Sequence, residues 1–124
     1  MNARAARLVG ALLGFVGVAL GAFGAHGLKA RVSPEMLEIF RTGAHYQLVH
    51  AVVLLVVGAL EGRLEARWAR TAALLFTAGV VVFSGSLYAL VLTGVRQLGA
   101  VTPLGGVLLL SGWLMLALAA WRAR

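Results

Sequence analysis

The sequence has 124 residues, of which 61% are hydrophobic and only 12% are charged. A soluble domain is about 45–50% apolar and about 25% charged, so these polar residues are too few to cover a soluble protein. The net charge of +7 comes from short clusters between apolar runs, with no basic stripe of interleaved aromatic residues, which argues against a nucleic-acid-binding protein. The chain has no cysteine, which excludes disulfides, iron–sulfur clusters and thiolate zinc sites. We expect one membrane domain over residues 1–124.

The first apolar run, residues 8–28, contains no Lys, Arg, Asp or Glu and is long enough to cross a bilayer. A signal peptide starts in the same way, but its apolar region is shorter, about 7–15 residues. Five glycines recur within the run at spacings of 4, 3, 4 and 3, namely Gly10, Gly14, Gly17, Gly21 and Gly24. Because small residues let a second backbone approach closely in lipid, the spacing predicts the central packing helix of a bundle.

A helix start follows at Ser33-Pro34-Glu35, with Ser as N-cap, Pro at the first helical position and an acid in the first turn. The amphipathic pattern over residues 34–43 predicts a short helix at the membrane surface. It runs without a break into a second apolar span, residues 44–60.

A charged connection over residues 61–70 leads to a third uncharged span, residues 71–95, and Pro103 opens a fourth, residues 103–121. The predicted fold is an all-α membrane protein, an up-down bundle of four transmembrane helices with an amphipathic interfacial helix after the first span. The N-terminus, the second connection and the C-terminus hold seven Lys and Arg residues, against four in the other two connections. This excess predicts that both termini are cytoplasmic.

This topology gathers most polar side chains of the spans in the outer half of the bundle. They are His26, His45, Tyr46, Gln47, His50, Ser84, Ser86, Tyr88 and Thr102. A polar group without a partner in hydrocarbon costs several kcal/mol, so these side chains should bond to one another. Two interpretations stay open: a structural network that joins the helices, and a pocket that binds a head group, a quinone-like ring or another small amphiphile.

A haem or metal site is a third interpretation, in which His26 and His50 face each other from different helices. His45 and His50 are five residues apart and do not form an i, i+4 ligand pair, and no carboxylate lies within a span. No nucleophile, base and carboxylate set can be drawn from the spans either. We therefore predict no metal, no cofactor and no catalytic residue, and expect a protein that is not an enzyme.

Four motifs occur in order along the chain: Gly21-Ala22-Phe23-Gly24-Ala25-His26, Thr42-Gly43 with Tyr46-Gln47 and His50, Phe83-Ser84-Gly85-Ser86-Leu87-Tyr88, and Thr102-Pro103-Leu104-Gly105-Gly106 with Gly112-Trp113. Together they resemble the YgdD-like family of small bacterial inner-membrane proteins, which has relatives among small animal transmembrane proteins. The resemblance implies a multi-spanning membrane protein and carries no established activity, substrate or cofactor. It marks as pattern positions His26, Tyr46, Gln47, His50, Ser84, Ser86 and Tyr88.

The expected function is a non-enzymatic, multi-pass membrane protein whose polar cluster binds a small amphiphile or a lipid head group. The alternative is a structural or assembly partner that works through glycine-rich helix faces. The expected partners are membrane lipids, a second copy of the chain or other membrane proteins, and no nucleic acid. A cavity lined by His26, His50 and Tyr88 favours binding, whereas a filled network with an exposed glycine face favours assembly.

Overall fold

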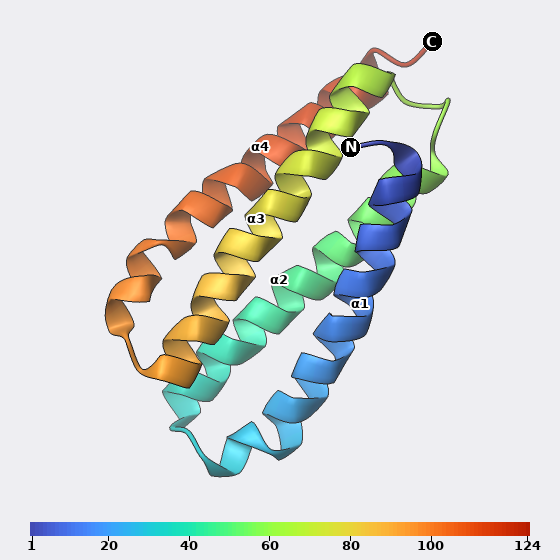
Figure 1. Ribbon diagram of the computed structural model, residues 1–124. Coiled ribbons are helices and arrows are strands. Elements are labelled where there is room, and N and C mark those ends of the chain that lie inside the picture. The colour runs from blue at the N-terminus through green and yellow to red at the C-terminus, as the bar shows by residue number, and fades with distance from the viewer.

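The computed structural model describes residues 1–124 and contains only helices. The four long helices are α1 (Ala3–His26), α2 (Pro34–Ala59), α3 (Ala66–Thr93) and α4 (Thr102–Trp121). Two short 3-10 helices occupy the connections at one end, η1 (Leu28–Ala30) and η2 (Arg96–Ala100). Each long helix has the length and apolar composition needed to cross a membrane, and successive helices run in opposite directions (Figure 1). The predicted four-helix up-down architecture is confirmed.

Local side chains define the helix ends. The side chains of Asn2, Ser33 and Glu65 cap α1, α2 and α3 by accepting a backbone N–H three residues further on, at 2.8, 3.2 and 3.2 Å. The predicted start at Ser33-Pro34 is therefore confirmed. Gly94 ends α3 in the left-handed region at φ +73°, which glycine adopts without steric cost.

Residues 34–43 differ from the prediction. They do not form a separate surface helix, because α2 is one continuous helix from Pro34 to Ala59. Leu37 and Phe40 are buried against Leu28, Leu90 and Val91 in a small apolar core at this end of the molecule. The amphipathic segment thus packs its apolar side on its neighbours, and no proline interrupts the helix where the second apolar span begins.

The four helices lie side by side in the order α1, α2, α3, α4 (Figure 1). Each packs on its neighbour in the chain, α1 barely reaches α3, and α1 and α4 do not touch. The prediction that the first span is the central helix is therefore wrong, since α1 lies at one edge of the row. Its glycines occupy only one face, and large side chains such as Phe15 and Leu12 are exposed on the others.

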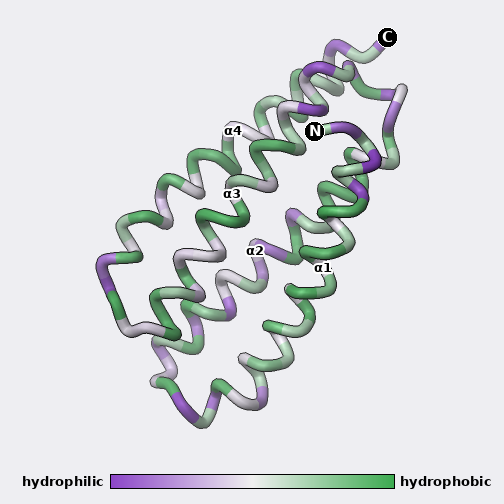
Figure 2. The backbone as a smooth tube through the Cα atoms, viewed as in Figure 1, coloured by the Kyte–Doolittle hydropathy of each residue, from purple (hydrophilic) through white to green (hydrophobic).

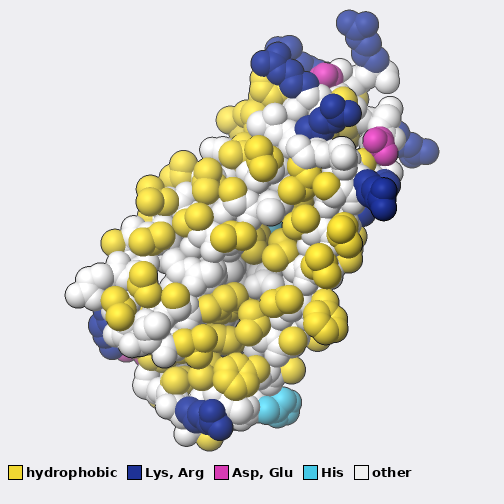
Figure 3. All heavy atoms as spheres, viewed as in Figure 1, with side chains coloured by type: hydrophobic (Ala, Val, Ile, Leu, Met, Phe, Trp, Pro, Cys, Tyr) yellow, Lys and Arg dark blue, Asp and Glu magenta, His cyan; other side chains and the backbone are white.

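Charged residues lie at the two ends and apolar residues cover the middle (Figures 2 and 3). One end, which we call the basic end, holds the N-terminus, the connection between α2 and α3, and the C-terminus. It carries seven of the eleven Lys and Arg residues. The opposite end, which we call the η end, carries η1, η2 and the other four.

Three of the five glycines of α1 lie directly against α2. A Cβ atom added at Gly10 would lie 2.8 Å from the Ala51 carbonyl oxygen, and one at Gly17 would lie 2.8 Å from Leu48. Gly24 lies against the ring of Phe40. These three glycines are seven residues apart, so they share one helix face. Gly14 and Gly21 lie beside this contact, with nothing closer than 3.9 Å to a Cβ at Gly14 and nothing within 4 Å at Gly21.

Helices α3 and α4 approach even more closely. Gly105 of α4 lies against the backbone of Phe83, where an added Cβ would be 2.7 Å from the Phe83 Cα. Gly79 of α3 and Gly112 of α4 accommodate Leu109 and Phe76 in the same way. Short backbone separation gives van der Waals contact in a medium where no hydrophobic force draws helices together.

Candidate functional site

Gln47 joins three helices. Its side-chain amide donates a hydrogen bond to the Leu13 carbonyl oxygen of α1 at 2.8 Å. Its Oε1 accepts a hydrogen bond from the Tyr88 hydroxyl of α3 at 2.7 Å. Gln47 is only 3% exposed, so both bonds form away from lipid and solvent. Gln47 thus bonds in both directions across the row.

His50 lies one turn further along α2 and has both ring nitrogens engaged. Its Nδ1 lies 2.7 Å from the Tyr46 carbonyl oxygen, which can only accept, so Nδ1 carries the proton. Its Nε2 accepts a hydrogen bond from the Trp113 indole N–H of α4 at 3.1 Å. These partners fix His50 as a neutral imidazole of one tautomer. The ring also packs beside Phe76, with centroids 5.5 Å apart.

Three hydroxyl side chains complete the contacts between helices. Ser84 donates to the Gly43 carbonyl oxygen at 2.7 Å and joins α3 to α2. Ser86 and Thr102 share a hydrogen bond of 2.6 Å that joins α3 to α4. We call the set Gln47, His50, Ser84, Ser86, Tyr88, Thr102 and Trp113 the polar network. It connects all four helices, and no buried side-chain nitrogen or oxygen lacks a partner.

The structure leaves two of the predicted cluster residues outside this network. His26, at the end of α1, and His45, on α2, are both exposed. Tyr46 is 40% exposed and takes part through its backbone carbonyl, while its ring packs on Phe83 at 4.5 Å between centroids. The other six predicted residues belong to the network.

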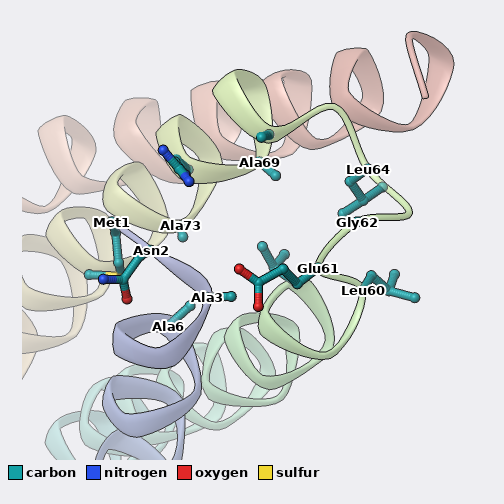
Figure 4. A pocket seen from close by; sticks show the side chains of 13 residues that line it. Met1, Asn2, Ala3, Ala6, Leu60, Glu61, Gly62, Leu64, Ala69 and Ala73 are labelled. Carbon is teal, nitrogen blue, oxygen red and sulfur yellow. The ribbon is translucent and has the colours of Figure 1, made fainter. Parts of the chain in front are cut away.

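A partly open cavity lies at the basic end, and no member of the polar network lines it. It has a volume of about 90 Å³ and lies between the start of α1, the end of α2 and the start of α3 (Figure 4). Its thirteen lining residues are Met1, Asn2, Ala3, Ala6, Val57, Leu60, Glu61, Gly62, Leu64, Ala66, Ala69, Arg70 and Ala73. Small residues at facing positions, such as Ala6 and Ala73, leave this space unfilled. Sequence reasoning directed at polar residues has no signal for it.

The sequence analysis missed one member of the polar network and two of its hydrogen-bond acceptors. Trp113 belongs to the fourth sequence motif but not to the predicted polar cluster, and its indole N–H donates to His50. The two acceptors are the backbone carbonyls of Leu13 and Gly43. A tryptophan in mid-span, away from the membrane interfaces, is a signal in itself, because a buried indole N–H needs an acceptor.

Comparison with known proteins shows what the chain resembles. Residues 20–106 match the family described as "Protein of unknown function (DUF423)". The UPF0382 membrane protein YwdK of Bacillus subtilis is 44% identical over 114 residues, covering 91% of this chain and 93% of the relative. A UPF0382 membrane protein of Staphylococcus epidermidis is 47% identical over 114 residues, covering 90% and 91%, and SAB0533 of Staphylococcus aureus is 42% identical over 117 residues, covering 93% of each.

No solved structure matches the chain significantly. The relatives are named as membrane proteins, in agreement with the four helices that can cross a membrane. Matches over nine tenths of each chain cover the polar network and the glycine contacts together. The chain therefore belongs to the DUF423/UPF0382 family of multi-pass bacterial membrane proteins, whose function is uncharacterised.

Proposed function

We propose that this chain is a non-enzymatic structural protein of the bacterial plasma membrane that assembles with a second copy of itself through the outer flank of α1. The observation that carries the proposal is a contrast between its polar residues and its glycines. The polar side chains expected to recognise a ligand are bonded to one another, whereas part of the glycine-rich surface has no partner.

The saturated network argues against ligand binding at the polar cluster. Both His50 nitrogens, both ends of the Gln47 amide and the Ser84 hydroxyl are bonded within the protein. Neither of the two main hollows is lined by a residue of the predicted cluster. A ligand would have to break two or more internal hydrogen bonds to reach these groups, at a cost of about 1 kcal/mol each.

The free surface lies on α1. Gly14 and Gly21 leave space beside the helix: a Cβ atom added at Gly14 would have its nearest neighbour at 3.9 Å, and one at Gly21 would have none within 4 Å. Together with small or medium residues spaced three and four apart they form a surface that we call the α1 flank: Ala11, Gly14, Val18, Gly21 and Ala25. Helix pairs in membranes use such small-residue faces because they let the two backbones approach closely. A face that meets its own copy across a two-fold axis forms a closed dimer.

The orientation follows from the basic end. Seven arginines gather there, and the positive-inside rule favours placing this end, with both termini, in the cytoplasm. The α1 flank then runs through the hydrocarbon region from the cytoplasmic side outward. Membrane lipids surround the exposed apolar side chains elsewhere on the two edge helices.

The test uses the absence of cysteine in the natural sequence. Val18→Cys places one thiol on the α1 flank, and Val16→Cys places one about 160° away around the same helix. Both valines are exposed, at 63% and 45%, and lie at nearly the same depth. The two variants are oxidised or treated with a short bis-maleimide in native membranes, and the products are separated by size.

We expect covalent dimers from Val18→Cys and few or none from Val16→Cys. Adding Gly21→Leu to the Val18→Cys variant should remove the dimer, because a bulky side chain blocks close approach of the backbones. Equal cross-linking at both positions, or none at either, would contradict the proposal.

A further inference from the structure

A second polar site lies at the basic end, separate from the polar network and from the α1 flank. It is an open cleft between the start of α3 and the C-terminal segment after α4. Its lining residues are Gly62, Leu64, Glu65, Arg67, Trp68, Arg122 and Arg124. The cleft thus presents three guanidinium groups, one carboxylate and one indole.

Backbone contacts hold the two sides of the cleft together. The Glu65 backbone N–H donates to the Ala119 carbonyl oxygen at 3.0 Å, which joins the start of α3 to the last turn of α4. The Glu65 carboxylate accepts a hydrogen bond from the Trp68 backbone N–H at 3.2 Å and caps α3. The single acid of the cleft is therefore engaged at the start of α3, and the same hydrogen bond holds the backbone of Trp68 in place.

Two arginines far apart in the sequence meet at this indole. The guanidinium carbon of Arg67 lies 5.2 Å from the centroid of the Trp68 ring, and that of Arg122 lies 5.8 Å from it. Cations within about 6 Å of an indole are attracted by its π electrons. Trp68 therefore positions two guanidinium groups around one aromatic platform.

Neither arginine has a carboxylate partner. The ion pairs of the molecule are Arg7–Glu61, Arg41–Glu38 and Arg96–Glu35, and none of them involves Arg67, Arg122 or Arg124. The planar fork of guanidinium donors matches the oxygens of a phosphate. The cleft is thus an unneutralised, geometrically defined place for an anion.

The position of the cleft specifies the anion. Its lining residues belong to the basic end, where the apolar surface of the helices gives way to Lys and Arg side chains (Figure 3). Tryptophan prefers this depth, and basic clusters beside transmembrane helices bind anionic lipids. We infer that the Arg67–Trp68–Arg122 cleft binds the phosphodiester headgroup of an anionic membrane phospholipid.

The test measures lipid retention by the purified full-length protein. Native mass spectrometry in a mild detergent compares dioleoyl phosphatidylglycerol with dioleoyl phosphatidylcholine at equal concentrations. An arginine at the bound headgroup contributes on the order of a factor of five, so removing both from the cleft by Arg67→Gln with Arg122→Gln should weaken phosphatidylglycerol binding roughly 30-fold. Phosphatidylcholine binding should stay unchanged.

The matched control removes two arginines of the same end that lie outside the cleft, Arg4→Gln with Arg63→Gln. It has the same net charge as the cleft variant and should retain phosphatidylglycerol within about twofold, because these two arginines do not line the cleft and would be separated from the bound headgroup by screening solvent. An equal loss in both variants would overturn the inference, since it would indicate diffuse attraction to the whole basic end.

Two further measurements keep the inference falsifiable. Thermal unfolding should show that both double variants fold, because all four arginines are on the surface. Inorganic phosphate at 10 mM should leave lipid retention unchanged. Displacement of the lipid at that concentration would instead indicate a site for free phosphate and would overturn the assignment to a membrane lipid.

Discussion

The inner helices α2 and α3 and the edge helices α1 and α4 are held by different means. The inner pair supplies most of the side chains that hydrogen-bond between helices, including Gln47, His50 and Tyr88. The edge helices supply glycines that let their backbones approach, such as Gly10 on α1 and Gly105 on α4. Polar bonds therefore set the register at the centre of the row, and close packing attaches its edges.

The contrast suggests an order of energetic importance. A blocked backbone contact must move a whole helix, whereas a lost hydrogen bond in a membrane costs about 0.6 kcal/mol on average. Substitutions at the tightly packed glycines should therefore lower the free energy of unfolding more than substitutions in the polar network. Four experiments test this ranking, each with unfolding free energies measured by titration with sodium dodecyl sulfate from mild detergent micelles.

The largest effect is expected at Gly105. In Gly105→Ala the new methyl group would lie against the backbone of Phe83, which cannot rotate away, so α4 must shift. We expect a loss of about 3 kcal/mol. Gly106→Ala is the control at the next position, where nothing lies within 4 Å, and it should be neutral or slightly stabilising. Similar losses in both variants would mean that helix packing is not the cause.

The second effect is at the other edge. Gly10→Ala places a methyl group 2.8 Å from the Ala51 carbonyl oxygen and should cost about 2 kcal/mol by displacing α1 from α2. Gly14→Ala, in the same helix, has its nearest neighbour at 3.9 Å and should cost nothing. If Gly14→Ala destabilised as much, the heptad spacing of the α1 contact would be refuted.

A smaller effect is expected from Gln47→Leu. The change keeps the volume similar but removes the bonds to Leu13 and Tyr88, and it leaves the Tyr88 hydroxyl without its acceptor. We expect a loss of about 1–2 kcal/mol. The double variant with Tyr88→Phe should be no less stable than Gln47→Leu alone, because the orphaned hydroxyl is then removed. If the losses of Gln47→Leu and Tyr88→Phe simply added in the double variant, that would argue against the hydrogen bond between Gln47 and Tyr88.

The smallest effect is expected from Trp113→Phe. It removes the N–H donated to His50 and preserves an aromatic ring beside Phe76, so the loss should be about 0.6 kcal/mol. Trp113→Phe combined with His50→Phe should cost no more than the sum of the two. A loss above 2 kcal/mol for Trp113→Phe alone would place the centre of stability in the network and reverse the ranking.

The sequence predicts the spans well because the physics is local. About twenty apolar residues in a row must form a helix in a bilayer. Ser33 and Pro103 mark helix starts through their own residue types, which can be identified in the sequence. The neighbours of each helix are a different matter. The glycine spacing of the first span indicates a close contact but does not identify the partner helix, so α1 was assigned to the centre although it lies at an edge.

The network was only partly predictable for a similar reason. Hydrophilic side chains can be read from the sequence, and six of the nine predicted ones bond across helices. Their acceptors include the backbone carbonyls of Leu13 and Gly43, and every residue has such a carbonyl. His26 has no such partner because it lies at the end of α1, where the chain leaves the row.

The inner helices are also longer than the last one, which has a mechanical consequence. At about 1.5 Å per residue, α2 with 26 residues and α3 with 28 span about 39 and 42 Å, whereas α4 with 20 residues spans about 30 Å. A hydrocarbon core is about 30 Å thick, so α2 and α3 must tilt or protrude. Because Ser84 and Tyr88 hydrogen-bond α3 to α2, we expect the two helices to move as one rigid unit. In a thinner bilayer, α2 and α3 must therefore tilt or protrude together.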